Sequence, residues 1–275
     1  MSSLRKLARR LYGTVFTAAM TRVNSGVQPL APKAMRAASG ASILHVVAPG
    51  ASASRPSNAS LAIEGDVLGV NYFALCRSSP YWPAARLFVI EPHETHLEYA
   101  RAISAVTEIG GPVDVIVKGA LSLSKAGAAA GLVRALSNVK GVRVNLANDM
   151  YLSDFDHSSF ARAMTDYPAH TFCGSKSLLW TISFGAAAGY RQIVLHGFDF
   201  SQDYAYETDE SDADAPRPNT WVSDEDTTRY VLNQVRALAT TLGERGIELT
   251  QSECEGPLSR ILPAYRQDHL KKAVS

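Results

Sequence analysis

Short apolar runs rich in β-branched residues recur along the chain and alternate with longer stretches of helical periodicity. The runs occupy residues 43–47, 67–70, 87–90, 113–117, 142–146, 193–196 and 247–249. The stretches of helical pattern occupy residues 93–106, 122–137, 175–188 and 227–245. Strands that are buried on both faces and alternate with helices are typical of a doubly wound sheet. We therefore predict an α/β fold built on a mostly parallel, Rossmann-like sheet.

One segment of the body lacks this alternation. Residues 203–226 hold nine carboxylates and two prolines but few aliphatic side chains. Such a composition is typical of a mobile loop. We predict a single domain over residues 42–275 with a small lid at about 202–226.

The formal net charge of +1 hides an asymmetry between the two parts of the chain. Residues 1–63 carry eight of the 27 basic residues and no acid, so the other 19 basic residues face all 26 acidic ones over the rest. This division indicates a basic arm joined to a mildly acidic body. A hydrophobic content of 46% excludes a disordered chain. Three cysteines predict neither a disulfide framework nor a zinc knuckle, which favours the cytoplasm.

The basic arm has helical periodicity, with Leu4, Leu7 and Leu11 on one face and cations on the other. Three interpretations stay open: contact of residues 1–24 with an anionic membrane surface, a helix packed on the body, or a mitochondrial presequence. Because no apolar run reaches 18 residues, we predict no transmembrane helix. The expected location is the cytoplasm, peripheral to the inner face of the membrane.

Residues 27–41 read as a linker because they contain Pro29, Pro32 and Gly40. The arm and linker together are therefore predicted to span residues 1–41.

Small or polar residues follow several predicted strands. They include the small residues 48–54, then Asn71, Glu91 and the stretch 197–202. In open parallel sheets, ligands bind beyond the carboxyl ends of the strands. We therefore expect these residues to converge on one binding site.

The common nucleotide and catalytic motifs do not occur. The sequence contains no G-x-G-x-x-G, no P-loop and no G-x-S-x-G elbow. His93 and His96 follow Glu91 but have no convincing third ligand, so we predict no metal site. We interpret His196, at the end of an apolar run, as a hydrogen-bonded core residue.

Several segments, taken in order, resemble the bacterial lipooligosaccharide sialyltransferases, which use CMP-sialic acid. Residues 48–52 match the family's G-N-G-P-S turn and residues 66–73 its second strand. The most specific match is the helix from Ser177, the Gly-x-Asp-Phe motif at 197–200 and the Tyr-Ala-Tyr at 204–206. The similarity runs from about residue 43 to 262 and implies a GT-A-like Rossmann fold.

The resemblance also implies roles for individual residues. Gly50 and Ser52 would meet the nucleotide, Asn71 the phosphate or leaving group, and Ser177 the donor from a helix N-terminus. The residues implied to shape the cytidine pocket are Gly197, Asp199 and Phe200. Tyr204 would stabilise the departing phosphate in place of a metal, so no cofactor is expected.

Three departures from the family pattern change this picture. Pro49 and Glu91 replace two of the family's asparagines, and a second anion beside a phosphate is unfavourable unless it is paired. The family's general-base histidine has no counterpart in residues 219–226. Asp224 and Asp226 are candidate bases, although both also suit the cap of a helix near residue 227, and His157 is an alternative base.

The resulting hypothesis is an inverting, metal-independent glycosyltransferase. It would move sialic acid or a related nonulosonate from a CMP-sugar to a glycan or lipid-linked acceptor. Two alternatives stay open: a non-catalytic nucleotide- or glycan-binding member of the superfamily, and a pterin pyrophosphokinase-like enzyme. We expect no nucleic-acid partner, and the sequence leaves a homo-oligomer open.

Overall fold

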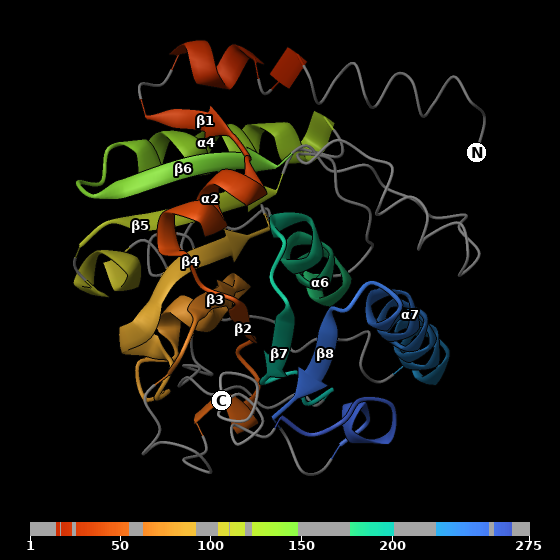
Figure 1. The fold of residues 1–275 in the computed structure, drawn as a ribbon. Helices are drawn as coiled ribbons and strands as arrows, with labels where there is room; N and C mark the ends of the chain where they lie inside the picture. The colour runs from red at the N-terminus through yellow and green to blue at the C-terminus, as the bar shows by residue number, and fades with distance from the viewer. Residues whose placement is uncertain are drawn as a thin grey trace, which may run out of the picture.

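The computed structural model describes residues 15–16, 18–23, 26–54, 63–91, 104–109, 111–118, 123–147, 177–200, 224–252 and 256–265. They form one eight-stranded sheet in the order β1-β6-β5-β4-β3-β2-β7-β8, in which every pair of neighbours is parallel (Figure 1). The strands are β1 (Val27–Pro29), β2 (Ile43–Val47), β3 (Asp66–Val70), β4 (Ala85–Ile90), β5 (Val113–Lys118), β6 (Val142–Ala147), β7 (Gln192–His196) and β8 (Glu248–Gln251). The predicted parallel α/β fold is confirmed.

Hydrophobic cores lie on both faces of the sheet. The helices with described bounds are α2 (Pro32–Ser39), α4 (Leu123–Ser137), α6 (Ser177–Ala188) and α7 (Glu225–Gly243). Short 3-10 turns add η1 (Ala51–Ser54), η2 (Asn71–Leu75), η3 (Trp82–Ala84) and η5 (Leu258–Arg260). Helices α6 and α7 share one core with β2, β3 and β7, whereas α4 and η2 pack in the other. All five residues of β2 are buried, which explains why four of them are apolar; the fifth is His45.

Helix α6 lies directly against the sheet. A Cβ added to Gly185 would come within 2.7 Å of Ile193 Cδ1, so glycine permits this close approach. The rings of Trp180 and Phe184 stack with centroids 5.6 Å apart in the same core. This tight packing holds the first residue of α6, Ser177, at a defined place near the sheet.

The linker predicted over residues 27–41 is instead β1 and α2. Val27 pairs with Val144, which makes β1 the edge strand beside β6. The residues that suggested a linker have structural uses here. Pro29 ends an edge strand, Pro32 occupies the start of α2, and Gly40 caps α2 with φ of +71°.

Hydrogen bonds at the starts of the strands attach α2 to the body. Asp66 accepts one from the hydroxyl of Ser39 and one from the phenol of Tyr190, both at 2.5 Å. The Arg36 guanidinium also lies 5.9 Å from the centre of the Tyr190 ring.

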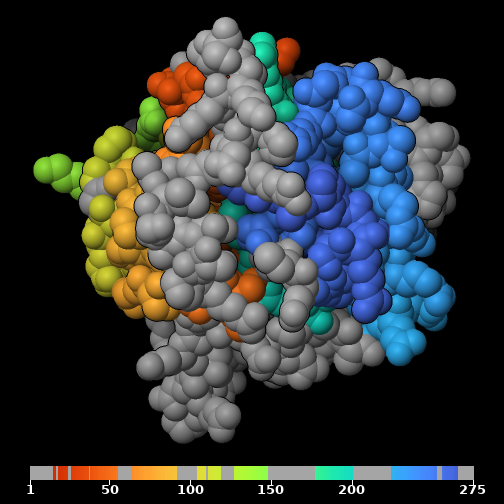
Figure 2. All heavy atoms as spheres, turned by 60° about the horizontal axis from the view of Figure 1, so that its bottom comes forward, coloured from red at the N-terminus to blue at the C-terminus, as the bar shows by residue number. Residues whose placement is uncertain are grey.

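The C-terminal elements gather on one side of the molecule. In Figure 2, α7 and residues 256–265 (blue) lie together on the right, and the strands and turns of the first half (orange to yellow) lie on the left. The predicted lid falls outside the described residues, except for 224–226, which begin α7. The predicted basic arm also lies largely outside them, because description begins at residue 15. No helix among the described residues is long and apolar enough to cross a membrane.

Candidate functional site

The turns after β2 and β7 are joined by backbone hydrogen bonds. Ala48 N–H donates to His196 O at 2.9 Å, and Gly50 N–H donates to Gly197 O at 3.1 Å. Because β2 and β7 are parallel neighbours, their ends lie at the same edge of the sheet. The residues at 50–52 and 197–200, predicted to bind the CMP-sugar donor, are therefore brought together.

Asp199 binds the first turn through two hydrogen bonds. Its Oδ2 accepts the Ser52 backbone N–H at 2.7 Å, and its Oδ1 accepts the Ser52 hydroxyl. The carboxylate therefore orders the small-residue turn. We call Gly50, Ser52, Gly197 and Asp199 the turn cluster.

Glycine is sterically required at two positions of the turn cluster. A Cβ on Gly50 would lie 2.3 Å from Gly197 O and 2.9 Å from Asp199 Oδ2. Gly197 has φ of +68°, and a Cβ there would lie 2.3 Å from Ala48 O. Phe200, with φ of +54°, also adopts a left-handed backbone that is uncommon outside glycine.

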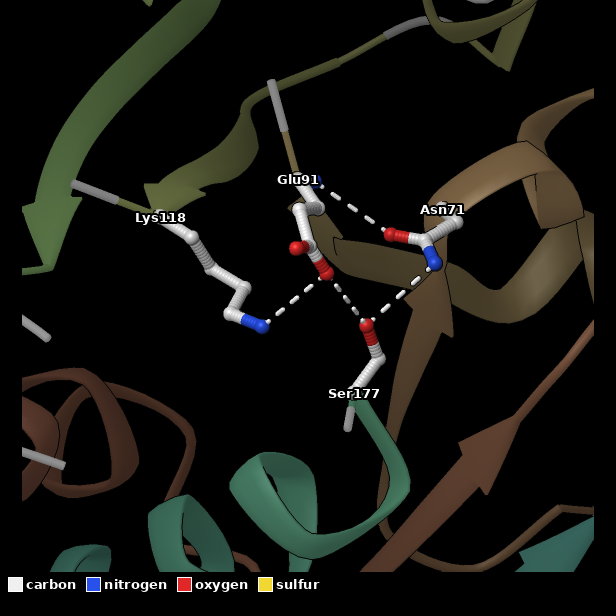
Figure 3. A network of polar contacts seen from close by, with 4 residues as sticks. All are labelled: Asn71, Glu91, Lys118 and Ser177. Carbon is white, nitrogen blue, oxygen red and sulfur yellow. Dashed lines mark hydrogen bonds and ion pairs between the residues drawn. The ribbon is translucent and has the colours of Figure 1, made fainter. Parts of the chain in front are cut away.

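A second cluster lies at the ends of β3, β4 and β5, next to the start of α6 (Figure 3). Asn71 Nδ2 donates to Ser177 Oγ at 3.3 Å, and Ser177 Oγ donates to Glu91 Oε2 at 3.2 Å. Asn71 Oδ1 accepts the Glu91 backbone N–H at 3.3 Å. Lys118 Nζ donates to the same Glu91 Oε2 at 3.2 Å. We call these four residues the strand-end quartet.

The strand-end quartet compensates the negative charge of Glu91, which would otherwise be unfavourable beside a phosphate. Its carboxylate forms an ion pair with Lys118, so the four side chains carry no net charge. Lys118 was missed from the sequence because it ends an apolar strand and no motif marks it. The only signal was a lysine directly after a buried run, and its partner depends on the pairing of β4 with β5.

Asn71 has a left-handed backbone, with φ of +51°. Asparagine tolerates this conformation better than most residues, yet it is less stable than the ordinary regions. Its amide is thereby placed to contact both the Glu91 backbone and the Ser177 hydroxyl.

The two carboxylates proposed as general bases lie at the start of α7. Asp224 is the N-cap: its Oδ1 accepts the Asp226 N–H at 3.1 Å, and its Oδ2 accepts the Thr227 hydroxyl. Asp226 forms an ion pair with Arg229, and its side chain is 82% exposed. The helix-cap interpretation of Asp224 is confirmed. Tyr204 and His157 lie outside the described residues.

A pair of buried histidines lies beneath the turn cluster. His45 Nε2 bonds the Glu64 carbonyl at 3.1 Å and His45 Nδ1 bonds His196 Nε2 at 3.0 Å. Because a carbonyl only accepts, His45 carries its proton on Nε2, and His196 must donate through its own Nε2. Among the described residues, His196 Nδ1 has no hydrogen-bond partner. The predicted role of His196 as a hydrogen-bonded core residue is confirmed.

Burial decides the charge of this pair. Desolvation lowers the pKa of His45, against a smaller raising effect of its bond to the Glu64 carbonyl. Desolvation, together with repulsion from His45, holds the pKa of His196 well below its usual value. Both rings are therefore neutral near pH 7. The rings of Tyr81 and Tyr265 pack against them, with Tyr81 4.4 Å from His196 between centroids.

No group of three or more His, Cys, Asp or Glu residues within the described ranges could hold a metal ion.

The chain was compared with known proteins at three levels. No family model matches the sequence, and no curated protein matches it. Among solved structures, it is similar to the sialyltransferase CST-II of Campylobacter jejuni in complex with a trisaccharide acceptor and CMP, with a TM-score of 0.49, 14% identity, and coverage of 82% of this chain and 86% of that chain. It is also similar to the monofunctional alpha-2,3-sialyltransferase Cst-I of the same organism, with a TM-score of 0.48, 11% identity, and coverage of 82% and 80%. The comparison of structures thus returns sialyltransferases, the class of enzyme that the sequence motifs resemble.

Proposed function

We propose that the protein is an inverting glycosyltransferase that takes sialic acid or a related nonulosonate from a CMP-sugar, without a metal. The acceptor is a glycan or a lipid-linked glycan. The observation that carries the proposal is the hydrogen bonding of Ser52 to Asp199, because it joins two motif segments at the carboxyl end of neighbouring strands.

The two clusters suit the two ends of such a donor. The turn cluster joins the small-residue turn after β2 to the Gly-x-Asp-Phe segment after β7 at one place, and both segments are assigned to the nucleotide. The strand-end quartet offers the amide of Asn71 and the hydroxyl of Ser177 beside a carboxylate whose charge is already compensated. Since β2 and β3 are neighbours, the two clusters lie at adjacent strand ends.

The reaction requires one bond to break and one to form. The acceptor hydroxyl attacks the anomeric carbon from the side opposite the phosphate, and CMP leaves with the electrons of the old bond. Tyr204 is proposed to donate a hydrogen bond to the leaving phosphate, a role that stabilises developing charge. The acceptor proton goes to a general base, for which Asp224 and Asp226 stay the candidates.

A non-catalytic, nucleotide-binding protein is the second candidate function. It is favoured by the engagement of both candidate bases at the start of α7, Asp224 as the cap and Asp226 with Arg229. A pterin pyrophosphokinase is disfavoured, because the carboxylate after β4 is paired with a lysine instead of a second carboxylate.

The decisive experiment measures ligand binding first and chemistry second. We expect CMP to raise the melting temperature in the presence of EDTA, and CDP, UDP, GDP and NAD to do so less. Stabilisation by a nucleotide only with Mg²⁺ would overturn the donor assignment. Incubation with CMP-sialic acid and other CMP-nonulosonates, with and without glycan acceptors, then separates the two candidates: release of CMP supports the enzyme, and binding without release supports the non-catalytic protein.

We further propose that residues 1–24 attach the protein to an anionic membrane surface. The support is the leucine and cation pattern of this segment. Co-sedimentation with phosphatidylserine vesicles should fall with added salt and on deletion of residues 1–24. Equal sedimentation of the truncated and full-length chains would remove this proposal.

A further inference from the structure

Lys118 is the buried cation of the strand-end quartet. Its side chain is only 4% exposed, compared with 23% for its partner Glu91. A buried ammonium group is costly unless an opposite charge accompanies it. The two residues are therefore held as one charged pair, with Nζ and Oε2 3.2 Å apart.

Glu91 needs this partner because of its surroundings. Its Oε2 accepts the Ser177 hydroxyl, and its backbone N–H donates to Asn71. Asn71 and Ser177 are the residues assigned above to the anionic part of the donor. An uncompensated carboxylate beside them would repel a phosphate or a sugar carboxylate, most strongly where solvent is excluded.

We propose that Lys118 is a positioning residue for the donor site: it fixes Glu91 and cancels its charge, so that Asn71 and Ser177 can bind an anionic group. Lys118 acts through Glu91, because it is the less exposed of the two and already donates to Glu91. This inference rests on the proposed CMP-sugar function.

The test uses the affinity for CMP divided by that for cytidine, measured by titration calorimetry on the full-length chain. The ratio reports the contribution of the phosphate, whereas a general loosening of the site would weaken both ligands. We expect Lys118→Met to lower the ratio at least about tenfold, because Glu91 then faces the anion without the opposing charge of Lys118. The double variant Glu91→Gln/Lys118→Met should restore the ratio to within about threefold of wild type, since it removes both charges.

Lys140→Met is the matched control. Lys140 is exposed just before β6, at the ends of the strands opposite to the quartet, and its loss should leave the ratio unchanged. An unreactive CMP-nonulosonate analogue separates the two anions. If the sugar carboxylate is the group concerned, Lys118→Met lowers the gain in affinity of the analogue over CMP; if it is the phosphate, the loss is already present with CMP.

Other results decide against the proposal. Equal losses for cytidine, CMP and the analogue in Lys118→Met would leave Lys118 a purely structural role. A low ratio that persists in the double variant would show that Lys118 contacts the ligand itself. If Lys118→Met does not fold, Lys118→Gln takes its place in the same comparison. A wild-type protein that binds neither ligand would instead overturn the proposed function.

Discussion

Asp199 and Ser52 are 147 residues apart in the chain and are joined by two hydrogen bonds, one from the serine backbone and one from its hydroxyl. The carboxylate thus belongs to a residue predicted to bind the CMP-sugar, and it is also the group that orders the turn after β2. Substitutions that remove more of these hydrogen bonds should therefore lower the CMP affinity more.

We expect Asp199→Asn to lower the CMP affinity at least about tenfold, because an amide nitrogen cannot accept a hydrogen bond from Ser52. Ser52→Ala should cost less, since the backbone N–H bond to Asp199 is kept. Calorimetric titration with CMP measures both. Glu108→Ala, an exposed acid paired with Arg77, is the control for a change of net charge. Equal affinities for Asp199→Asn and this control would contradict the assignment.

Gly50 and Gly131 provide a matched pair of Gly→Ala substitutions. Gly50→Ala should destabilise the protein by about 1–3 kcal/mol and abolish the stabilisation by CMP, because the new Cβ meets Gly197 O at 2.3 Å. Gly131→Ala in α4 meets nothing within 4 Å and should stabilise by about 0.5–1 kcal/mol. Urea unfolding measures both changes. A harmless Gly50→Ala would argue against the close approach of the two turns.

Tyr204→Phe tests the proposed leaving-group donor. We expect kcat to fall roughly 10²-fold with little change in CMP binding, because the lost hydrogen bond acts on charge that develops in the transition state. Steady-state kinetics with a CMP-nonulosonate donor measures the first quantity and calorimetry the second. Tyr206→Phe, two residues away, is the control. Unchanged turnover in Tyr204→Phe would leave the stabilisation of the phosphate to other residues.

Asp224 separates a helix cap from a general base. Asp224→Ala should lower the free energy of unfolding by about 1 kcal/mol, whereas Asp224→Asn should change it little, because asparagine is an equally good N-cap. We expect turnover to survive in Asp224→Asn, in keeping with the contacts of Asp224 to Asp226 and Thr227. A tenfold loss of turnover at unchanged stability would identify Asp224 as the base.

The buried histidine pair predicts a loss of stability in mild acid. The pKa values of His45 and His196 are lowered in the folded protein, so the unfolded chain binds more protons once the pH falls below about 6.5. The contribution of the pair is complete above that pH and decreases as the pH falls toward the lowered folded values, by up to about 1.4 kcal/mol per pH unit and histidine. Urea unfolding at pH 7.5 and 5.5 measures the change. In His45→Gln/His196→Gln the dependence on pH should be weaker; an unchanged dependence would assign the protons to other groups.

The sheet could be predicted because burial on both faces leaves a direct trace in the sequence. The runs at 43–47 and 113–117 are apolar except for His45 and Asp114, and the structure has β2 and β5 there. The site residues after the strands could be predicted once the strands were located, because parallel strands end on the same side of the sheet. Asn71, Glu91 and Ser177 do meet one another.

The order of the strands and the partners of individual side chains could not be predicted. Proline and glycine mark turns in most contexts, so the sequence predicts a linker where the structure has β1 and α2. Lys118 meets Glu91 only because β5 lies beside β4. His45 meets His196 only because β2 lies beside β7. A pattern within one segment carries no information on which strand lies next to it.

The position of β1 has a consequence for synthesis on the ribosome. Gln28 pairs with Asn145, 117 residues later, whereas β2, β3, β4 and β5 each pair with the next strand along the chain. At a synthesis rate of about 5–20 residues per second, β1 remains without its partner for roughly 6–23 s after it is made. The edge strand is thus among the first elements to be translated, yet it joins the sheet only after β6 has been added. A nascent chain halted before β6 should therefore expose residues 27–29 to proteases that the finished protein resists.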